Sequence, residues 1–295
     1  MSEPYWTISR NNIITQLIIN NKEGIMLRVG IVGCGAIGSA ICHALDTQIE
    51  GAQLVAIHEH HIELVESLIT TLRCKPKVMK IRQMVQKVDL IVEAASPNVV
   101  APTALLALEN GCSVMIMSVG ALVDNQLLHK LVTLAKEHNC KIYIPSGAVT
   151  GIDGIKSASI AGIKSVTLIT TKPPQALTGA PYVVDNNIDL NGFKEPAVIF
   201  EGTASEAVKA FPANVNVALS ISLAGIGTKK TRVNIVVDPN SDKNRHKIEV
   251  IGDFGKFTSC VENIPSPDNP HTSYLAALSA IATLKKIASP LQIGT

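Results

Sequence analysis

The sequence predicts an α/β protein in which a doubly wound parallel sheet is followed by a second α+β domain. Three observations support this fold class. A glycine-rich turn follows the first apolar strand, short apolar strands then alternate with helical segments, and this alternation stops near residue 148. A length of 295 residues also fits two domains, because a domain averages roughly 150 residues. We expect residues 26–145 to form the first domain, 146–270 the second, and a C-terminal helix within 271–290 to complete the first.

Residues 1–25 precede the first strand and are expected to be an N-terminal extension. They are polar and rich in asparagine, and they contain neither a basic leader nor a small-residue cleavage site. Met26 stands directly before the first strand, so a start set too early is the alternative explanation.

The first strand and turn read LRVGIVGCGAIG over residues 27–38, with glycines at G-x-G-x-x-G spacing. Gly33 allows the tight turn, Gly35 lets the backbone approach a pyrophosphate, and Gly38 lets the following helix pack closely on the sheet. Ala36 and Ile37 open that helix, whose N-terminus attracts an anion. These five residues are therefore expected to bind a dinucleotide in a Rossmann-type domain.

Glu59 follows the second predicted strand, residues 52–57, after a helix over residues 36–45. It stands about 20 residues beyond the glycine motif, where an acidic side chain accepts the hydroxyls of the adenosine ribose. This favours NAD without excluding NADP. His58, His60 and His61 flank it; a solvated loop explains them better than a metal site, because no further ligand spacing is present. The same histidines are compatible with a 2′-phosphate.

The alternation continues with helices over 62–72, 101–110 and 124–138 and with strands over 88–95, 113–118 and 141–144. Ligands of doubly wound sheets bind outside the carboxyl ends of the strands. Ser96, Ala121 and Ala148 follow three of these ends, so they are expected near the nicotinamide half of the cofactor. The alternative is that small residues simply terminate the strands.

The second domain is predicted from strands over 165–171, 198–201, 231–238 and 247–252 and helices over 205–210 and 215–223. The last apolar segment, residues 272–287, begins with a Thr/Ser cap and is expected to pack back on the first domain.

Composition excludes several classes of function. Aromatic residues make up 3% of the chain and the net charge is +2, so no footprint for nucleic acid is present. No stretch approaches the roughly 18 apolar residues that a membrane helix needs. The six cysteines contain no C-x-x-C pair, which favours reduced thiols in a cytoplasm over a zinc site or a disulfide framework.

Several strings together resemble the L-aspartate dehydrogenase family: GCGAIG, VEAAS, SVGAL, IPSGAVTGIDGI, FEGTASEAVKAFPANVNVA, HKIEVIGDFG and NPHTSYLAALSAI. The resemblance implies oxidation of L-aspartate to iminoaspartate with NAD or NADP. The imine would hydrolyse to oxaloacetate and ammonia or pass to quinolinate synthase for NAD biosynthesis. The resemblance also implies a homodimer, with the second domain serving substrate binding and dimerisation.

The family's catalytic histidine falls on His246, and its cofactor contacts fall on Ala148 and Asn216. In a strand with a period of two, His246 shares a face with Ile248 and Val250, so its ring is expected to point inward. An inward histidine is more often a hydrogen-bonded core residue, but it can also accept a proton near neutral pH. Asn216 has the donor and acceptor that match a nicotinamide carboxamide.

The substrate carboxylates need donors, and four residues with hydroxyl or amide groups are candidates: Ser146, Asn214, Thr272 and Ser273. His271 stands where the family commonly has lysine. It is either a neutral helix-entry residue or a weakened carboxylate contact, and it is the rival of His246 for the catalytic role.

Two other functions stay open. One is another two-domain reductase, of the homoserine or dihydrodipicolinate type, although its substrate-domain motifs are not found. The other is a dinucleotide-binding sensor without turnover, against which His246 and the intact FEG to FPANVNVA stretch argue.

Overall fold

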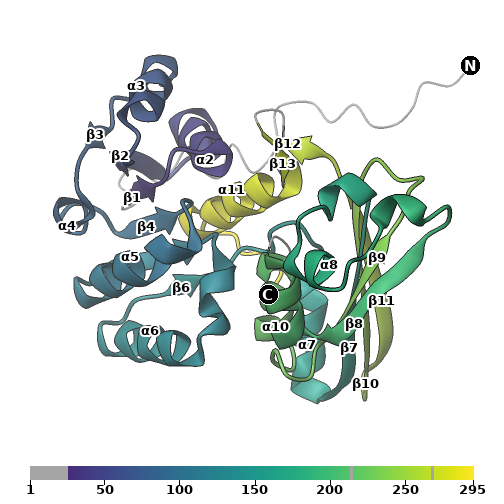
Figure 1. Cartoon of the computed structure of the whole chain (residues 1–295). Coiled ribbons are helices and arrows are strands. Elements are labelled where there is room, and N and C mark those ends of the chain that lie inside the picture. Colours follow the sequence, from purple (N-terminus) through teal and green to yellow (C-terminus); the bar gives the residue numbers. More distant parts are fainter. Residues whose placement is uncertain (1–25, 213–214, 267–268) are drawn as a thin grey trace, which may run out of the picture.

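The computed structural model describes residues 26–212, 215–266 and 269–295, so the expected extension over residues 1–25 lies outside the described residues. Its first sheet has six parallel strands in the order β3-β2-β1-β4-β5-β6. The strands are β1 (Leu27–Val32), β2 (Ala52–His58), β3 (Lys77–Val78), β4 (Leu90–Glu93), β5 (Ser113–Ile116) and β6 (Ile142–Tyr143). The order reverses between β1 and β4, which confirms the doubly wound prediction (Figure 1).

Helices cover both faces of this sheet, as a parallel sheet requires. One face packs against α2 (Ala36–Thr47), α3 (Ile62–Thr71) and α11 (Tyr274–Ala288). The other packs against α4 (Ile81–Met84), α5 (Pro97–Glu109) and α6 (Asn125–Glu137). None of the described helices is long and apolar enough to cross a membrane.

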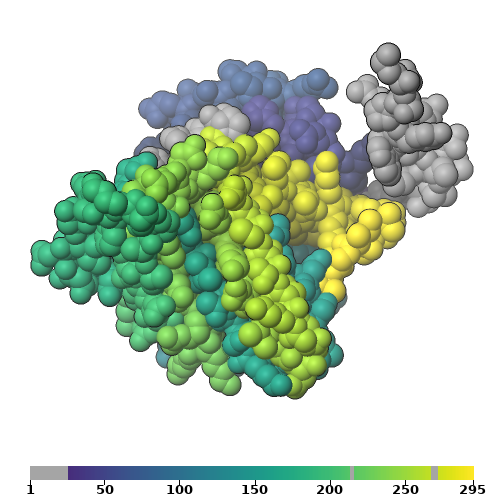
Figure 2. Space-filling view, turned by 90° about the vertical axis from the view of Figure 1, so that its right-hand side faces the viewer, coloured from purple at the N-terminus to yellow at the C-terminus, as the bar shows by residue number. Residues whose placement is uncertain are grey.

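The C-terminal helix α11 lies between the two halves of the molecule and returns to the first sheet (Figures 1 and 2). Ala280 and Leu284 are fully buried in the core that includes Ile41 of α2. The helix starts later than the sequence predicts, because Thr272 and Ser273 belong to β13 (Asn269–Ser273), which pairs with β12 (Pro265–Ser266).

The second sheet has five strands in the order β11-β10-β7-β9-β8, and only β7 and β9 are parallel. The strands are β7 (Ile163–Lys172), β8 (Ala197–Thr203), β9 (Arg232–Val237), β10 (Asn244–Gly252) and β11 (Gly255–Asn263). One face packs on α7 (Ile152–Ala161), α9 (Ala204–Ala210) and α10 (Val215–Ala224). The short α8 (Pro181–Asp185) precedes β8. The predicted α+β character of this half is confirmed.

Several boundaries differ from the sequence prediction. Helix α5 starts at Pro97 rather than at residue 101, because proline suits the first turn, where its missing N–H costs nothing. Strand β5 ends at Ile116, and residues Val119–Val123 form a 3₁₀ turn. Ser273 stands at the N-cap of α11, but its hydroxyl donates to Asn263 Oδ1 at 2.7 Å instead of capping the helix.

Candidate active site

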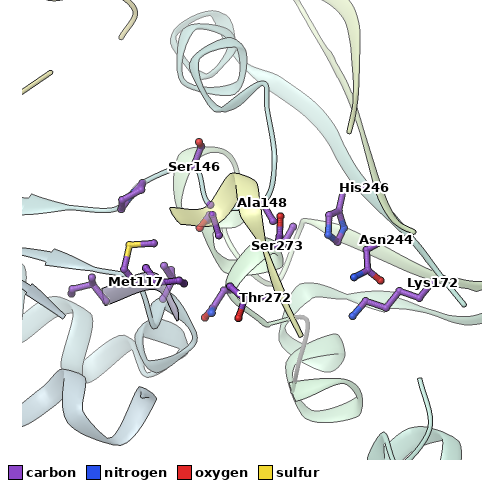
Figure 3. A pocket seen from close by; sticks show the side chains of 17 residues that line it. Met117, Ser146, Ala148, Lys172, Asn244, His246, Thr272 and Ser273 are labelled. Carbon is purple, nitrogen blue, oxygen red and sulfur yellow. The ribbon is translucent and has the colours of Figure 1, made fainter. Parts of the chain in front are cut away.

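A pocket of about 220 Å³ opens where the carboxyl ends of β5 and β6 meet β7, β10 and α11 (Figure 3). It brings together seven of the residues expected at the site: Ile37, Ser146, Ala148, Asn216, His246, Thr272 and Ser273. The other glycine-turn residues, Glu59, Ser96 and Ala121 do not line it, and Asn214 lies outside the described residues. The side chain of His271 is likewise not described.

The glycine turn has the shape that a bound pyrophosphate needs. A Cβ added to Gly33 would meet Ala94 O at 2.6 Å, and one added to Gly38 would collide with Gly33 O, so both positions need glycine. A Cβ added to Gly35 would meet nothing within 4 Å, which leaves open space beside the N-terminus of α2. No side chain caps that helix, so its first amides can bind an anion. These residues fit a dinucleotide.

Glu59 stands at the end of β2 and contacts the glycine turn directly. Its Oε2 accepts a hydrogen bond from the Cys34 amide at 2.8 Å, and its Oε1 accepts one from the His60 amide at 2.6 Å. Burial alone would raise the pKa of Glu59, but hydrogen bonds from Cys34, His61 and His60 hold it below its ordinary value. The ionised carboxylate is therefore fixed beside the turn, where an adenosine ribose would lie.

The buried carboxylate of Glu93 joins the ends of β4 and β5. Oε1 accepts from the Ala95 amide and the Ser118 hydroxyl, each at 2.9 Å, and Oε2 accepts from the Ser118 amide at 3.0 Å. Ser96 follows Glu93 in the chain and is the N-cap of α5. Ala121 follows Ser118 and lies in the 3₁₀ turn. Both residues lie at the rim of the sheet but away from the pocket lining.

Asn216 of α10 reaches across to the first sheet. Its Oδ1 accepts a hydrogen bond from the Gly120 amide at 2.8 Å, which fixes the orientation of the side-chain amide in the pocket. With the oxygen engaged, the Nδ2 group is the one that can donate to a ligand.

His246 of β10 is 6% exposed and lies opposite Thr170 of β7. Its inward orientation, expected from the strand period, is confirmed. Nδ1 lies 3.0 Å from Thr170 Oγ1. Burial, aided by the positive charge of Lys172, lowers the pKa of His246 to about 4, so the imidazole is neutral at pH 7. A neutral imidazole in a pocket can take up a proton.

Two further lining residues, Lys172 and Asn244, were not expected from the sequence. Lys172 is the last residue of β7 and is only 9% exposed, and burial lowers its pKa. Asn244 is the first residue of β10, on the same face as His246. Figure 3 shows Lys172, Asn244 and His246 together on one side of the pocket, facing Thr272 and Ser273. The sequence gives only a weak indication that Lys172 and Asn244 belong to a site, because each is simply a polar residue at the end of a strand.

Asn263 ties the opposite wall together. Its Nδ2 donates to Ala148 O at 2.9 Å, while its Oδ1 accepts from the Ser273 hydroxyl. The Gly147 amide donates to Ser279 Oγ of α11 at 3.0 Å. This wall is therefore made of small residues, and most of the polar groups that fix it are already paired with one another.

Comparisons with known proteins point to one family. The model described as "Aspartate dehydrogenase, C-terminal" matches residues 153–287, and "Homoserine dehydrogenase, NAD binding domain" matches residues 33–145. The L-aspartate dehydrogenase of Methanosarcina acetivorans is 58% identical over 274 residues, which are 92% of this chain and 100% of that protein. The L-aspartate dehydrogenase of Nitrosopumilus maritimus is 43% identical over 273 residues, again 92% and 100%.

Solved structures agree with this. The crystal structure of aspartate dehydrogenase from Thermotoga maritima superposes with a TM-score of 0.71 at 28% identity, covering 91% of this chain and 99% of that one. A scyllo-inositol dehydrogenase from Lactobacillus casei with bound NAD(H) has a TM-score of 0.56 at 16% identity, covering 91% of each chain, which shows the fold alone.

Proposed function

The chain belongs to the L-aspartate dehydrogenase family, and we propose that it oxidises L-aspartate to iminoaspartate with His246 as the base. We assign His246 as the base because its imidazole is buried and neutral and lies in the pocket at the carboxyl ends of the first sheet. The cofactor is NAD or NADP, in keeping with the NAD-binding model that matches the first half.

The residues that would hold the cofactor belong to the glycine turn, the end of β2 and the pocket. Gly35 and the first amides of α2 suit the pyrophosphate, and Glu59 suits the adenosine ribose. Ala148 and the Nδ2 group of Asn216 suit the nicotinamide end. When bound, the cofactor accepts a hydride from the substrate α-carbon at nicotinamide C4.

The remaining task of the chain is to remove one proton. We assign the Nδ1 hydrogen of His246 to the bond with Thr170 Oγ1, which leaves the Nε2 lone pair for the substrate. As the hydride leaves the α-carbon, a C=N double bond forms and an N–H proton passes from the substrate amine to Nε2. The substrate loses one hydride and one proton in total, and the oxidation balances.

Only the first half of the chain supports a homoserine-type reductase. The family model named for that enzyme matches residues 33–145, and it describes the NAD-binding domain alone. The second half, which holds His246 and Lys172, matches the aspartate dehydrogenase model. A sensor without turnover would need a defective site, and His246 stands buried in the pocket with its ring fixed.

L-aspartate is the proposed substrate, and we also propose that the protein forms a homodimer. Its support is the face of the second sheet that the described helices leave uncovered. On this face Val198 is 53% exposed and Ile251 is 41% exposed, so a second copy of the chain would cover apolar surface there. Light scattering of the purified protein measures its mass directly, and a monomeric mass would refute the dimer.

The activity is tested by following the reduced-nicotinamide absorbance when the purified protein is mixed with L-aspartate and NAD or NADP. His246→Ala and His271→Ala are measured in parallel. We expect reduction with L-aspartate that is lost in His246→Ala and retained in His271→Ala. Loss in His271→Ala alone would move the base to His271. No reduction, and no oxidation of reduced cofactor with oxaloacetate and ammonia, would refute the dehydrogenase function.

A further inference from the structure

The part of the pocket that the structure describes holds a buried cation with no counter-charge. Lys172 and His246 are the only ionisable side chains among the described residues that line it. None of the four ion pairs between described residues includes Lys172, and burial is the only cause that shifts its pKa. A buried ammonium without a partner is costly, so its retention calls for an anionic ligand.

Lys172 lies close to the proposed base. It is the last residue of β7, two residues after Thr170, which pairs with His246. Figure 3 shows Lys172 on the same side of the pocket as the imidazole, with its ammonium directed toward the middle of the pocket. One small ligand can therefore meet the cation and the base together.

We propose that Lys172 Nζ binds a carboxylate of the substrate, which holds the substrate amine within reach of His246. This inference rests on the proposed function and deepens it by assigning substrate recognition.

The arrangement also links substrate binding to the base. The positive charge of Lys172 helps to lower the pKa of His246 in the free protein. A carboxylate bound to Lys172 cancels that charge and makes the imidazole a stronger base only when the substrate is present. Of the lining residues, no other ionisable group acts on His246.

The test compares Lys172→Met with Lys164→Met, an exposed lysine on the same strand that pairs with Asp253. We expect Lys172→Met to lower kcat/KM for L-aspartate by about 100-fold, leave the KM of the cofactor unchanged, and move the acid limb of the kcat/KM profile to higher pH. Lys164→Met should match the wild type. Thermal unfolding checks folding, and Lys172→Met should melt no lower than wild type, because it removes an unpaired buried charge.

An unchanged kcat/KM in a folded Lys172→Met protein would overturn the carboxylate contact. Failure of the proposed function is distinguishable, because then the wild type itself shows no turnover with L-aspartate. In that event, calorimetric titration of L-aspartate into the protein with reduced cofactor decides the inference: binding that weakens at least 10-fold in Lys172→Met supports it, and equal or absent binding overturns it.

The same titration with L-asparagine identifies which carboxylate is bound. L-asparagine lacks only the side-chain carboxylate, so a contact to that group leaves its Kd equal in wild type and Lys172→Met. A contact to the α-carboxylate weakens both ligands alike.

Discussion

Thr170 Oγ1 lies 3.0 Å from Nδ1 of His246, in the buried cross-strand pair that joins β7 to β10. This contact fixes the ring and decides which nitrogen carries the hydrogen. Thr170→Val is therefore expected to lower kcat about 10-fold with little change in the KM of the cofactor. Thr170→Ser, which keeps the hydroxyl, should restore most of the rate. Equal rates in Thr170→Val and wild type would show that the contact is structural only.

The lowered pKa of His246 makes stability depend on pH. The unfolded chain protonates this histidine near its ordinary value of 6.5, whereas the folded chain does so near 4. The stability that the neutral ring contributes is thus complete above about pH 6.5 and is lost as the pH falls toward 4, by about 3 kcal/mol in total. Denaturant unfolding of wild type and His246→Gln at pH 7 and pH 4.5 measures this. A constant difference between the two proteins would contradict it.

The glycine turn offers a matched pair of variants. Gly35 has φ of −65° and open space around it, so Gly35→Ala should fold with an unchanged melting temperature. Its methyl group would occupy the space proposed for the pyrophosphate and raise the KM of the cofactor at least about 10-fold. Gly38→Ala puts a methyl group against Gly33 O and should lower the melting temperature instead. An unchanged KM of the cofactor in Gly35→Ala, together with a lowered melting temperature, would show that the pyrophosphate does not bind beside Gly35.

Glu59 is expected to set the preference between the two cofactors. Glu59→Ser removes the carboxylate beside the turn, which should weaken NAD and raise the NADP to NAD ratio of kcat/KM about 10-fold. Glu63, an exposed acid in the first turn of α3, supplies the control variant Glu63→Ser. Cofactor kinetics at saturating L-aspartate measure both, and an unchanged ratio in Glu59→Ser would exclude Glu59 from ribose recognition.

Helix α11 is expected to stabilise the first half of the chain. Leu284 is fully buried against that core, so Leu284→Ala should cost about 2 to 5 kcal/mol of unfolding free energy. Leu278 of the same helix is 40% exposed, and Leu278→Ala should cost at most about 0.5 kcal/mol. Denaturant unfolding measures the free energy of unfolding of both variants. Equal losses would show that the packing of Leu284 against the first core does not stabilise the protein.

The first half of the fold was predictable because its evidence is local. Buried parallel strands are nearly all apolar, and the glycine motif marks the first turn, so β1, β2 and β4 stand out from the sequence. Edge strand β11 was missed, because its alternate residues are exposed and polar and it is recognisable as a strand mainly through its pairing with β10. Helix α7, a short segment between two glycines, was also missed.

The site was predictable only in part for a related reason. The strand period alone indicates that His246 points inward. Lys172 is buried and Asn244 half-buried because β7, β10 and the segment before α11 converge around them, although these segments lie far apart in the chain. Solvent exposure at a strand end depends on such tertiary contacts. Local sequence therefore cannot separate a buried lysine from a solvated one.

The return of α11 to the first sheet has a consequence for the newly made protein. A ribosome completes the six strands of that sheet well before it reaches Ala280 and Leu284, which fill the core beside α2. Until then the part of this apolar face that α2 and α3 do not cover stays exposed, and it is the kind of surface that chaperones bind. The part of the enzyme that is synthesised first is therefore the last to be finished.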